Sequence, residues 1–209
     1  MKVISLFSGG LDSTVLLSFL KQKRCKVYPL TINYGQRHER EIQASKEVCK
    51  VLNIKTQKII DISDISQLLM SSSLIDKTGD LSAQELAIVP NRNAILLSLA
   101  TAWAVSMNTN YVAFAGHKSD NPYPDCTNMF IRKFEMSMRE GNNREITILN
   151  PFINMEKWEV VKEGMLMGSP IEKSYSCYKG NKEPCGKCHT CLERKDAINK
   201  ATKFIVKNK

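Results

Sequence analysis

The sequence predicts an α/β fold in which an open parallel sheet is flanked by helices. Three observations support this prediction. Short apolar runs alternate with helical patterns over the first two-thirds of the chain. A glycine-rich turn separates the first apolar run from the first helical pattern. The length of 209 residues fits one ordinary domain that buries a core of its own.

The first half of the chain supplies three strands and two helices. Residues 2–7 form a continuous β-type run, so we predict a strand there and a helix over residues 12–22. A second apolar run predicts a strand over residues 27–33, and a helical pattern follows over residues 39–52. Residues 57–62 are the third β-type run.

The second half continues the alternation. Residues 92–106 are rich in Leu and Ala and give the clearest helix, and a buried strand is predicted over residues 111–116. Residues 126–140 and 156–167 carry apolar residues at helical spacing. The regular pattern then stops, and it resumes in a last helix over residues 190–201.

Three segments are predicted as loops because they are rich in small, polar or turn-forming residues: 71–73, 76–83 and 118–124. The composition, 43% hydrophobic and 24% charged, is that of a globular protein. No apolar run reaches the roughly 18 residues of a membrane span. The first apolar stretch breaks at Ser8-Gly9-Gly10, so we interpret it as a buried strand and expect a cytoplasmic protein without membrane contact.

The formal net charge is +9, and much of it lies near the C-terminus. Residues 173–209 hold ten basic residues against Glu183, Glu193 and Asp196. A solvated basic tail explains this excess at least as well as a nucleic-acid surface. Binding to nucleic acid therefore stays open but is not favoured.

A phosphate-binding loop is predicted at Ser8-Gly9-Gly10-Leu11-Asp12-Ser13. It follows a strand and precedes a helix, where free amide groups and the helix dipole favour anions. Gly9 and Gly10 allow the backbone to curl around a phosphate, and the two serines add hydroxyl donors. Asp12 would repel phosphate, so we expect it to bind the Mg²⁺ that accompanies a nucleoside triphosphate.

The alternative for this segment is a glycine turn with Asp12 or Ser13 as an ordinary helix cap. The segment lacks the lysine of the common P-loop and the spacing of the dinucleotide fingerprint. It resembles the SGGxDS loop of the PP-loop ATP pyrophosphatases, which transfer AMP to a carbonyl oxygen. The residues that the resemblance assigns to ATP are Phe7, Ser8, Gly9, Gly10, Leu11, Asp12, Ser13 and Thr14.

A metal site is predicted near the C-terminus, where four cysteines fall within 15 residues. The pattern Cys177-x7-Cys185-x2-Cys188-x2-Cys191 offers four thiolates to one tetrahedral Zn²⁺. A redox C-x-x-C pair fits three successive cysteines less well, and His189 is the less favoured replacement ligand. We expect the zinc to be structural, holding a segment too irregular to bury a core.

Together these features resemble the QueC family of PP-loop enzymes, the 7-cyano-7-deazaguanine synthases. The similarity runs from Val3 to about Ala197 and is carried by five blocks in order. They are Phe7 to Ser13, Tyr34-Gly35-Gln36-Arg37-His38, Val89-Pro90-Asn91-Arg92-Asn93, Tyr123-Pro124-Asp125-Cys126, and Ser176-Cys177-Tyr178 with Cys185-Gly186-Lys187-Cys188.

The resemblance implies an open parallel five-stranded sheet of the adenine nucleotide alpha hydrolase type. It implies a PP-loop domain over residues 1–170 and a zinc-binding tail over residues 171–209, packed on the same domain. The implied activity is an ATP-dependent carbon–nitrogen ligase of queuosine biosynthesis. It converts 7-carboxy-7-deazaguanine and ammonia to 7-cyano-7-deazaguanine through an adenylated acid and an adenylated amide. The family also implies a homodimer.

Site roles are carried over residue by residue. Asp12, Arg92 and Asp125 are expected to be catalytic, with Asp125 either helping to bind Mg²⁺ or reading the guanidine-like edge of the deazaguanine. Arginine suits a carboxylate or a phosphate because its guanidinium can bind either one with two hydrogen bonds. The expected substrate-binding residues are Tyr34, Gln36, Arg37, His38, Arg92, Asn93, Tyr123 and Asp125.

The sequence departs from the family's pattern where the substrate is expected. Residues 116–122 lack the aromatic residue and the glycine of that pattern, and Asn91 stands where Gly or Ala is usual. This departure leaves the first of three alternatives open, whereas the net charge of +9 supports the second and the intact loop from Ser8 to Ser13 argues against the third. The three alternatives are a QueC-like enzyme that adenylates a different carboxylate or a macromolecular acceptor, a tRNA-modifying PP-loop enzyme, and a non-enzymatic zinc-ribbon module.

Overall fold

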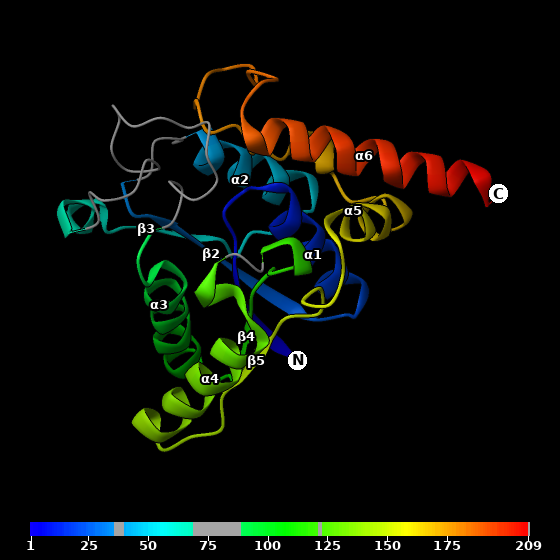
Figure 1. The fold of residues 1–209 in the computed structure, drawn as a ribbon. Coiled ribbons are helices and arrows are strands. Elements are labelled where there is room, and N and C mark those ends of the chain that lie inside the picture. Colours follow the sequence, from blue (N-terminus) through cyan, green and yellow to red (C-terminus); the bar gives the residue numbers. More distant parts are fainter. Residues whose placement is uncertain (36–39, 69–88, 121–122, 209) are drawn as a thin grey trace.

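The computed structural model describes residues 1–35, 40–68, 89–120 and 123–208 (Figure 1). Its sheet has five parallel strands in the order β3-β2-β1-β4-β5. Ile4 of the central strand pairs with Tyr28 on one side and with Val112 on the other. The strands are β1 (Lys2–Leu6), β2 (Lys26–Asn33), β3 (Lys58–Asp61), β4 (Tyr111–Ala113) and β5 (Thr147–Leu149).

Helices cover both faces of the sheet. Alternate side chains of a strand point to opposite faces, so apolar side chains on each face have to be buried. Val3 of β1 belongs to one buried cluster and Ile4 to another. The first cluster includes residues of α1 (Leu11–Gln22), α2 (Arg40–Val51), α5 (Lys157–Leu166) and α6 (His189–Lys207). The second includes residues of α3 (Arg92–Ser106) and α4 (Asn128–Asn142), which lie together on the other side in Figure 1.

The predicted fold class is confirmed, and all ten elements predicted from the chain pattern are present. The fifth strand is at Thr147–Leu149, which was not located in advance because three residues are too short for a recognisable apolar run. The strand predicted over residues 111–116 was too long, since β4 ends at Ala113. The last helix was predicted too short and continues to Lys207.

The loop predictions have different outcomes. Residues 71–73 and 76–83 lie outside the described part of the chain. The segment 118–124 is irregular as expected, with short 3₁₀ turns at Lys118–Asp120 and Pro124–Cys126; residues 121–122 are not described. Within the described residues, no helix is long and apolar enough to cross a membrane.

The C-terminal helix completes the main core. Ala197 and Ala201 of α6 are buried in the same cluster as Val3 and Leu16. The short side chains of these alanines let α6 lie close to its neighbours. The core beside β1 therefore includes residues from both ends of the chain.

Candidate active site and metal centre

The glycine-rich loop lies between β1 and α1, at the carboxyl end of the central strand. Gly9 has φ +90°, and a Cβ at this position would lie 2.2 Å from the backbone oxygen of Glu41 in α2. The loop therefore requires glycine both for its conformation and for its contact with α2. The amide of Tyr175 donates a hydrogen bond of 3.0 Å to the carbonyl oxygen of Gly9.

The hydroxyl groups of the loop face one another. Ser8 Oγ lies 3.2 Å from Ser13 Oγ and accepts a hydrogen bond of 3.0 Å from the amide of Gly10. Gly10 is the N-cap of α1, and no side chain caps that helix. Neither Asp12 nor Ser13 is thus the cap that the alternative required. The start of α1 retains amide groups and a dipole that can bind an anion.

Asp12 lies in the first turn of α1 and is held by the side chains of Lys157 and His117. Its Oδ2 is 3.2 Å from Lys157 Nζ and 3.6 Å from His117 Nε2. Burial alone would raise the pKa of this carboxyl group, but Lys157 and His117 hold the pKa well below its usual range. Its Oδ1 is buried without a hydrogen-bond partner in the described chain. One carboxylate oxygen thus stays available for a metal ion.

Lys157 and His117 each have a further acidic partner. Lys157 Nζ also lies 2.9 Å from Glu193 of α6, and His117 Nε2 lies 3.6 Å from Asp120. Burial opposes protonation of His117, yet the neighbouring Asp12 and Asp120 carboxylates raise its pKa. The first turn of α1 is therefore linked to α5, to α6 and to the loop after β4.

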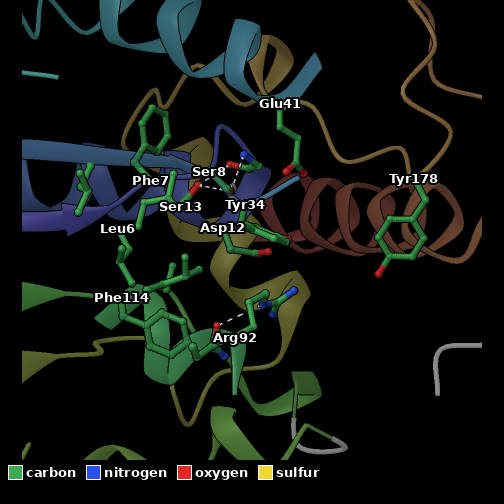
Figure 2. Close-up of a pocket in the computed structure, with 16 residues that line it drawn as sticks. Leu6, Phe7, Ser8, Asp12, Ser13, Tyr34, Glu41, Arg92, Phe114 and Tyr178 are labelled. Atoms are coloured by element: carbon green, nitrogen blue, oxygen red, sulfur yellow. Dashed lines mark hydrogen bonds between the residues drawn. The ribbon is translucent and has the colours of Figure 1, made fainter. Parts of the chain in front are cut away.

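A cavity of about 240 Å³ opens beside the loop (Figure 2). Its polar end is formed by Ser8, Gly10, Asp12 and Ser13. An apolar floor beside a few convergent polar groups is typical of a small-molecule site. The floor consists of Leu6, Leu30, Ile32, Leu96, Phe114 and Ala115.

Arg92 and Glu41 reach this cavity from opposite sides, as Figure 2 shows. Arg92 is the first residue of α3 and follows Asn91, whose φ of +54° is left-handed. Burial opposes the charge of Arg92, but Tyr34, Cys126 and Asp125 raise its pKa further. Burial raises the pKa of Glu41 to about 8, although Arg92 acts in the opposite direction.

Asp125 holds the start of α3 rather than lining the cavity. Its Oδ2 accepts a hydrogen bond of 2.9 Å from the amide of Asn93, and its Oδ1 one of 3.2 Å from Asn93 Nδ2. The same Nδ2 lies 3.1 Å from Cys126 Sγ. This network fixes the first turn of α3 and so orients Arg92, the residue that precedes Asn93.

The structure brings together most of the expected ATP-loop residues but divides the expected substrate residues. Tyr34, Arg92 and Asn93 line the cavity, whereas Tyr123 and Asp125 do not. Gln36, Arg37 and His38 lie outside the described residues. Of the loop residues assigned to ATP, those that line the cavity are Phe7, Ser8, Gly10, Asp12 and Ser13; Leu11 and Thr14 are buried beneath it.

Four functional candidates were missed from the sequence: Glu41, His117, Lys157 and Tyr178. Glu41 follows the Tyr34 to His38 block by three residues, so adjacency to that motif was a usable signal. Tyr178 belongs to the Ser176-Cys177-Tyr178 block, although no site role was assigned to it. His117 lies in the segment that departs from the family's pattern. Lys157 carries no such signal, because only the tertiary fold brings α5 to Asp12.

The four C-terminal cysteines lie close enough together to hold one metal ion. Their sulfur atoms all lie within 4.8 Å of one another, as one tetrahedral ion requires. Amides of Cys185 and Cys188 donate to the sulfurs of Cys177 and Cys185 at 3.3 and 3.4 Å. Amides of Lys187 and Cys188 lower the pKa of the Cys185 thiol to about 6, which favours the thiolate. His189 begins α6 and is not part of the cluster.

Comparisons with known proteins agree with this architecture. The family model "Queuosine biosynthesis protein QueC" matches residues 2–202. A 7-cyano-7-deazaguanine synthase from Psychromonas ingrahamii is 39% identical over 205 residues, which are 94% of this chain and 92% of that relative. One from Aquifex aeolicus is 35% identical over 209 residues, covering 94% of this chain and 95% of that relative.

A solved structure supports the fold alone. The NH₃-dependent NAD synthetase from Campylobacter jejuni superposes with a TM-score of 0.52 at 20% sequence identity. The match covers 99% of this chain and 84% of that one. The arrangement of strands and helices is therefore shared with an enzyme whose sequence has diverged widely.

Proposed function

The chain belongs to the QueC family of queuosine biosynthesis proteins, and we propose on this basis that it is a 7-cyano-7-deazaguanine synthase. It converts 7-carboxy-7-deazaguanine and ammonia to the nitrile and splits ATP into AMP and pyrophosphate. The main observation in support of the proposal is that the phosphate loop, the apolar floor and Arg92 all line one cavity. Phosphates, a planar base and a carboxylate can all be bound there.

The reaction needs ATP because a carboxylate is a poor electrophile. Its leaving group would be oxide, whereas an acyl adenylate can expel AMP. Ammonia attacks the adenylate to give an amide, and adenylation of the amide oxygen then allows loss of AMP to form the nitrile. Both adenylates are hydrolysed by water, so the site has to exclude it. The buried apolar floor of the cavity serves this purpose.

The residues of the cavity suggest how substrates are held. Ser8, Gly10 and Ser13 bind phosphate oxygens, and the dipole of α1 favours their charge. Arg92 binds the substrate carboxylate or the α-phosphate of ATP, and its fixed charge favours the developing negative charge on either. Asp125 positions Arg92 through the first turn of α3 and takes no direct part.

A Mg²⁺ ion fits beside Asp12. The fit rests on Asp12 Oδ1, a buried carboxylate oxygen without a hydrogen-bond partner in the described chain. Oxygen is the ligand that Mg²⁺ prefers, and the ion would neutralise phosphate charge at the mouth of the loop. Lys157 and His117 hold the other oxygen and keep the carboxylate ionised.

A Zn²⁺ ion fits the cysteine cluster because four thiolates within one coordination sphere suit this metal. We assign it a structural role, since every ligand position is filled by protein. The proposed zinc-binding tail of residues 171–209 then packs on the PP-loop domain of residues 1–170. From the family resemblance we propose that the protein is cytoplasmic and forms a homodimer. Measuring its mass in solution tests the homodimer.

Mass spectrometry of a reaction with pure protein, ATP, Mg²⁺, ammonium and 7-carboxy-7-deazaguanine tests the assignment. We expect the nitrile and AMP, and neither when Asp12 is replaced by Asn. AMP without nitrile, or no turnover by folded metal-loaded protein, contradicts the substrate assignment. Screening of other carboxylates and macromolecular acceptors would then start from the unusual segment 116–122.

A further inference from the structure

Glu41 places a carboxyl group in the wall of the cavity, directly beside the phosphate loop. It is the second residue of α2, and its Oε1 lies 3.9 Å from the point where a Cβ on Gly10 would be. Arg92 faces it from α3 on the other side (Figure 2). A group bound in the cavity beside Gly10 is therefore within reach of this carboxylate.

Glu41 and Asp12 are both carboxylates of the cavity, but their surroundings differ. Asp12 is held by Lys157 and His117, which keep it ionised. No comparable ion pair holds the Glu41 side chain among the residues that the structure describes. Among the described residues, the titratable groups that interact with Glu41 are Arg92 of α3, Tyr34 after β2 and Tyr178 of the cysteine segment. Burial dominates and raises the pKa of Glu41 to about 8.

The proposed reaction sets a chemical requirement that these features meet, and the inference rests on that proposed function. Near neutral pH most ammonia in solution is ammonium, which has no lone pair and cannot attack a carbonyl carbon. The site therefore has to bind a small cation and remove one proton from it. A carboxylate does the first through a charge-assisted hydrogen bond. It does the second best when its pKa is close to the working pH.

We propose that Glu41 is the ammonium-binding group and general base of the amination step. Bound ammonium favours the ionised form of Glu41, because a nearby positive charge stabilises a carboxylate. The cation binds between this carboxylate and the phosphate of the acyl adenylate. A proton moves from nitrogen to Glu41, leaving ammonia and a neutral carboxyl group. The nitrogen lone pair forms a bond to the carbonyl carbon, and the bond from that carbon to the AMP oxygen breaks, its electron pair leaving with AMP. The nitrogen of the adduct then loses a second proton to water, which gives the amide. Glu41 later releases the proton that it took from ammonium to water.

Hydroxylamine distinguishes a role of Glu41 in removing a proton from ammonium from a role in binding the acid or ATP. It is a neutral nucleophile near neutral pH, so it needs no proton removal before attack and gives a hydroxamate. Three rates are measured for wild type and Glu41→Gln. They are ATP–pyrophosphate exchange with 7-carboxy-7-deazaguanine in the absence of amine, nitrile formation with ammonium, and hydroxamate formation with hydroxylamine.

For Glu41→Gln we expect nitrile formation to fall about 100-fold, the lower end of the range for losing a general base. Exchange and hydroxamate formation should stay within about twofold of wild type, because neither needs that base. Glu41→Asp should recover part of the nitrile rate. Glu47→Gln is the matched control, since Glu47 lies on the same helix, where its carboxylate pairs with Gln43. It should leave all three rates unchanged.

Two results overturn the inference. A loss of exchange in Glu41→Gln means that Glu41 binds the acid or ATP, and an equal loss of hydroxamate and nitrile means that it does not act on ammonium. If Glu41→Gln fails to fold, Glu41→Asp decides the matter, because a lower nitrile rate with an unchanged hydroxamate rate is still required. Absence of exchange in wild type contradicts the proposed function itself, which keeps the two failures distinguishable.

Discussion

The two walls of the cavity are built in different ways. The phosphate loop is one contiguous stretch whose shape is set by a positive φ at Gly9 and by contact with the backbone of α2. The facing wall carries Tyr178 and belongs to the irregular segment that holds the cysteines. The walls meet where the Tyr175 amide donates to Gly9. Backbone packing preforms the first wall, whereas the second depends on the segment for which a metal ion is proposed.

The largest effect should come from Gly9→Ala, which breaks the preformed wall. The new Cβ would lie 2.2 Å from the Glu41 oxygen and 2.7 Å from the Ser45 amide, at a φ that disfavours alanine. We expect ATP–pyrophosphate exchange to fall by about 100-fold or more, since a shift of one ångström in a site has that effect. The free energy of unfolding should fall by about 2 kcal/mol or more.

Gly141→Ala is the matched control for this variant. Nothing lies within 4 Å of a Cβ at Gly141, which is in α4. Its exchange rate and unfolding midpoint should stay at wild-type values or rise slightly, because alanine favours helix. Equal behaviour of the two variants would mean that the loop is not fixed by its packing on α2.

The second largest effect should come from Cys188→Ser, which removes one proposed metal ligand beside the second wall. Losing one thiolate opens the coordination shell, so we expect less than one bound metal ion per chain and an exchange rate about 10-fold lower. Elemental analysis and exchange assays measure the two quantities. Cys25→Ser is the control, since Cys25 lies outside the cluster. Full exchange activity in metal-free Cys188→Ser would show that the walls are independent.

A smaller effect is expected for Tyr178→Ala, which tests what the second wall contributes to binding. Removing a ring from the cavity wall should raise KM for ATP or for the acid by about 10-fold, the value of a good aromatic contact. The kcat should change little, because the phosphate loop and Arg92 are untouched. Tyr178→Phe keeps the ring and should retain wild-type KM. A drop in kcat without a change in KM would assign Tyr178 a different role.

The smallest effect concerns the ion pairs behind the loop. The pKa of His117 is raised in the folded protein above its unfolded value of about 6.5. Protonated His117 therefore contributes its full stabilisation at pH values below the unfolded pKa. This stabilisation is lost as the pH rises through the pKa of the folded protein. The free energy of unfolding of wild type should exceed that of His117→Gln by about 1 kcal/mol in mild acid. Denaturant titrations should show this difference shrinking above neutral pH. A difference independent of pH contradicts the charged contact with Asp12.

Features that are local in the sequence could be predicted, and features assembled by the fold could not. The phosphate loop and the cysteine cluster depend on residues a few positions apart, so their motifs were sufficient. Lys157 reaches Asp12 across 145 positions, and no pattern along the chain brings them together. Asp125 was expected at the substrate because it lies in a family block. Its hydrogen bonds to Asn93 became visible only when the loop after β4 was positioned against α3.

The link between Tyr175 and Gly9 has a consequence for the order of synthesis. The phosphate loop precedes Tyr175, Tyr178 and the four clustered cysteines in the chain, so it is synthesised before them. A domain generally folds as a unit. A nascent chain therefore carries an ATP loop without its second wall, and it also lacks Ala197 and Ala201 of the core. The complete cavity and the core behind it can therefore form only after the chain has been made as far as Ala201.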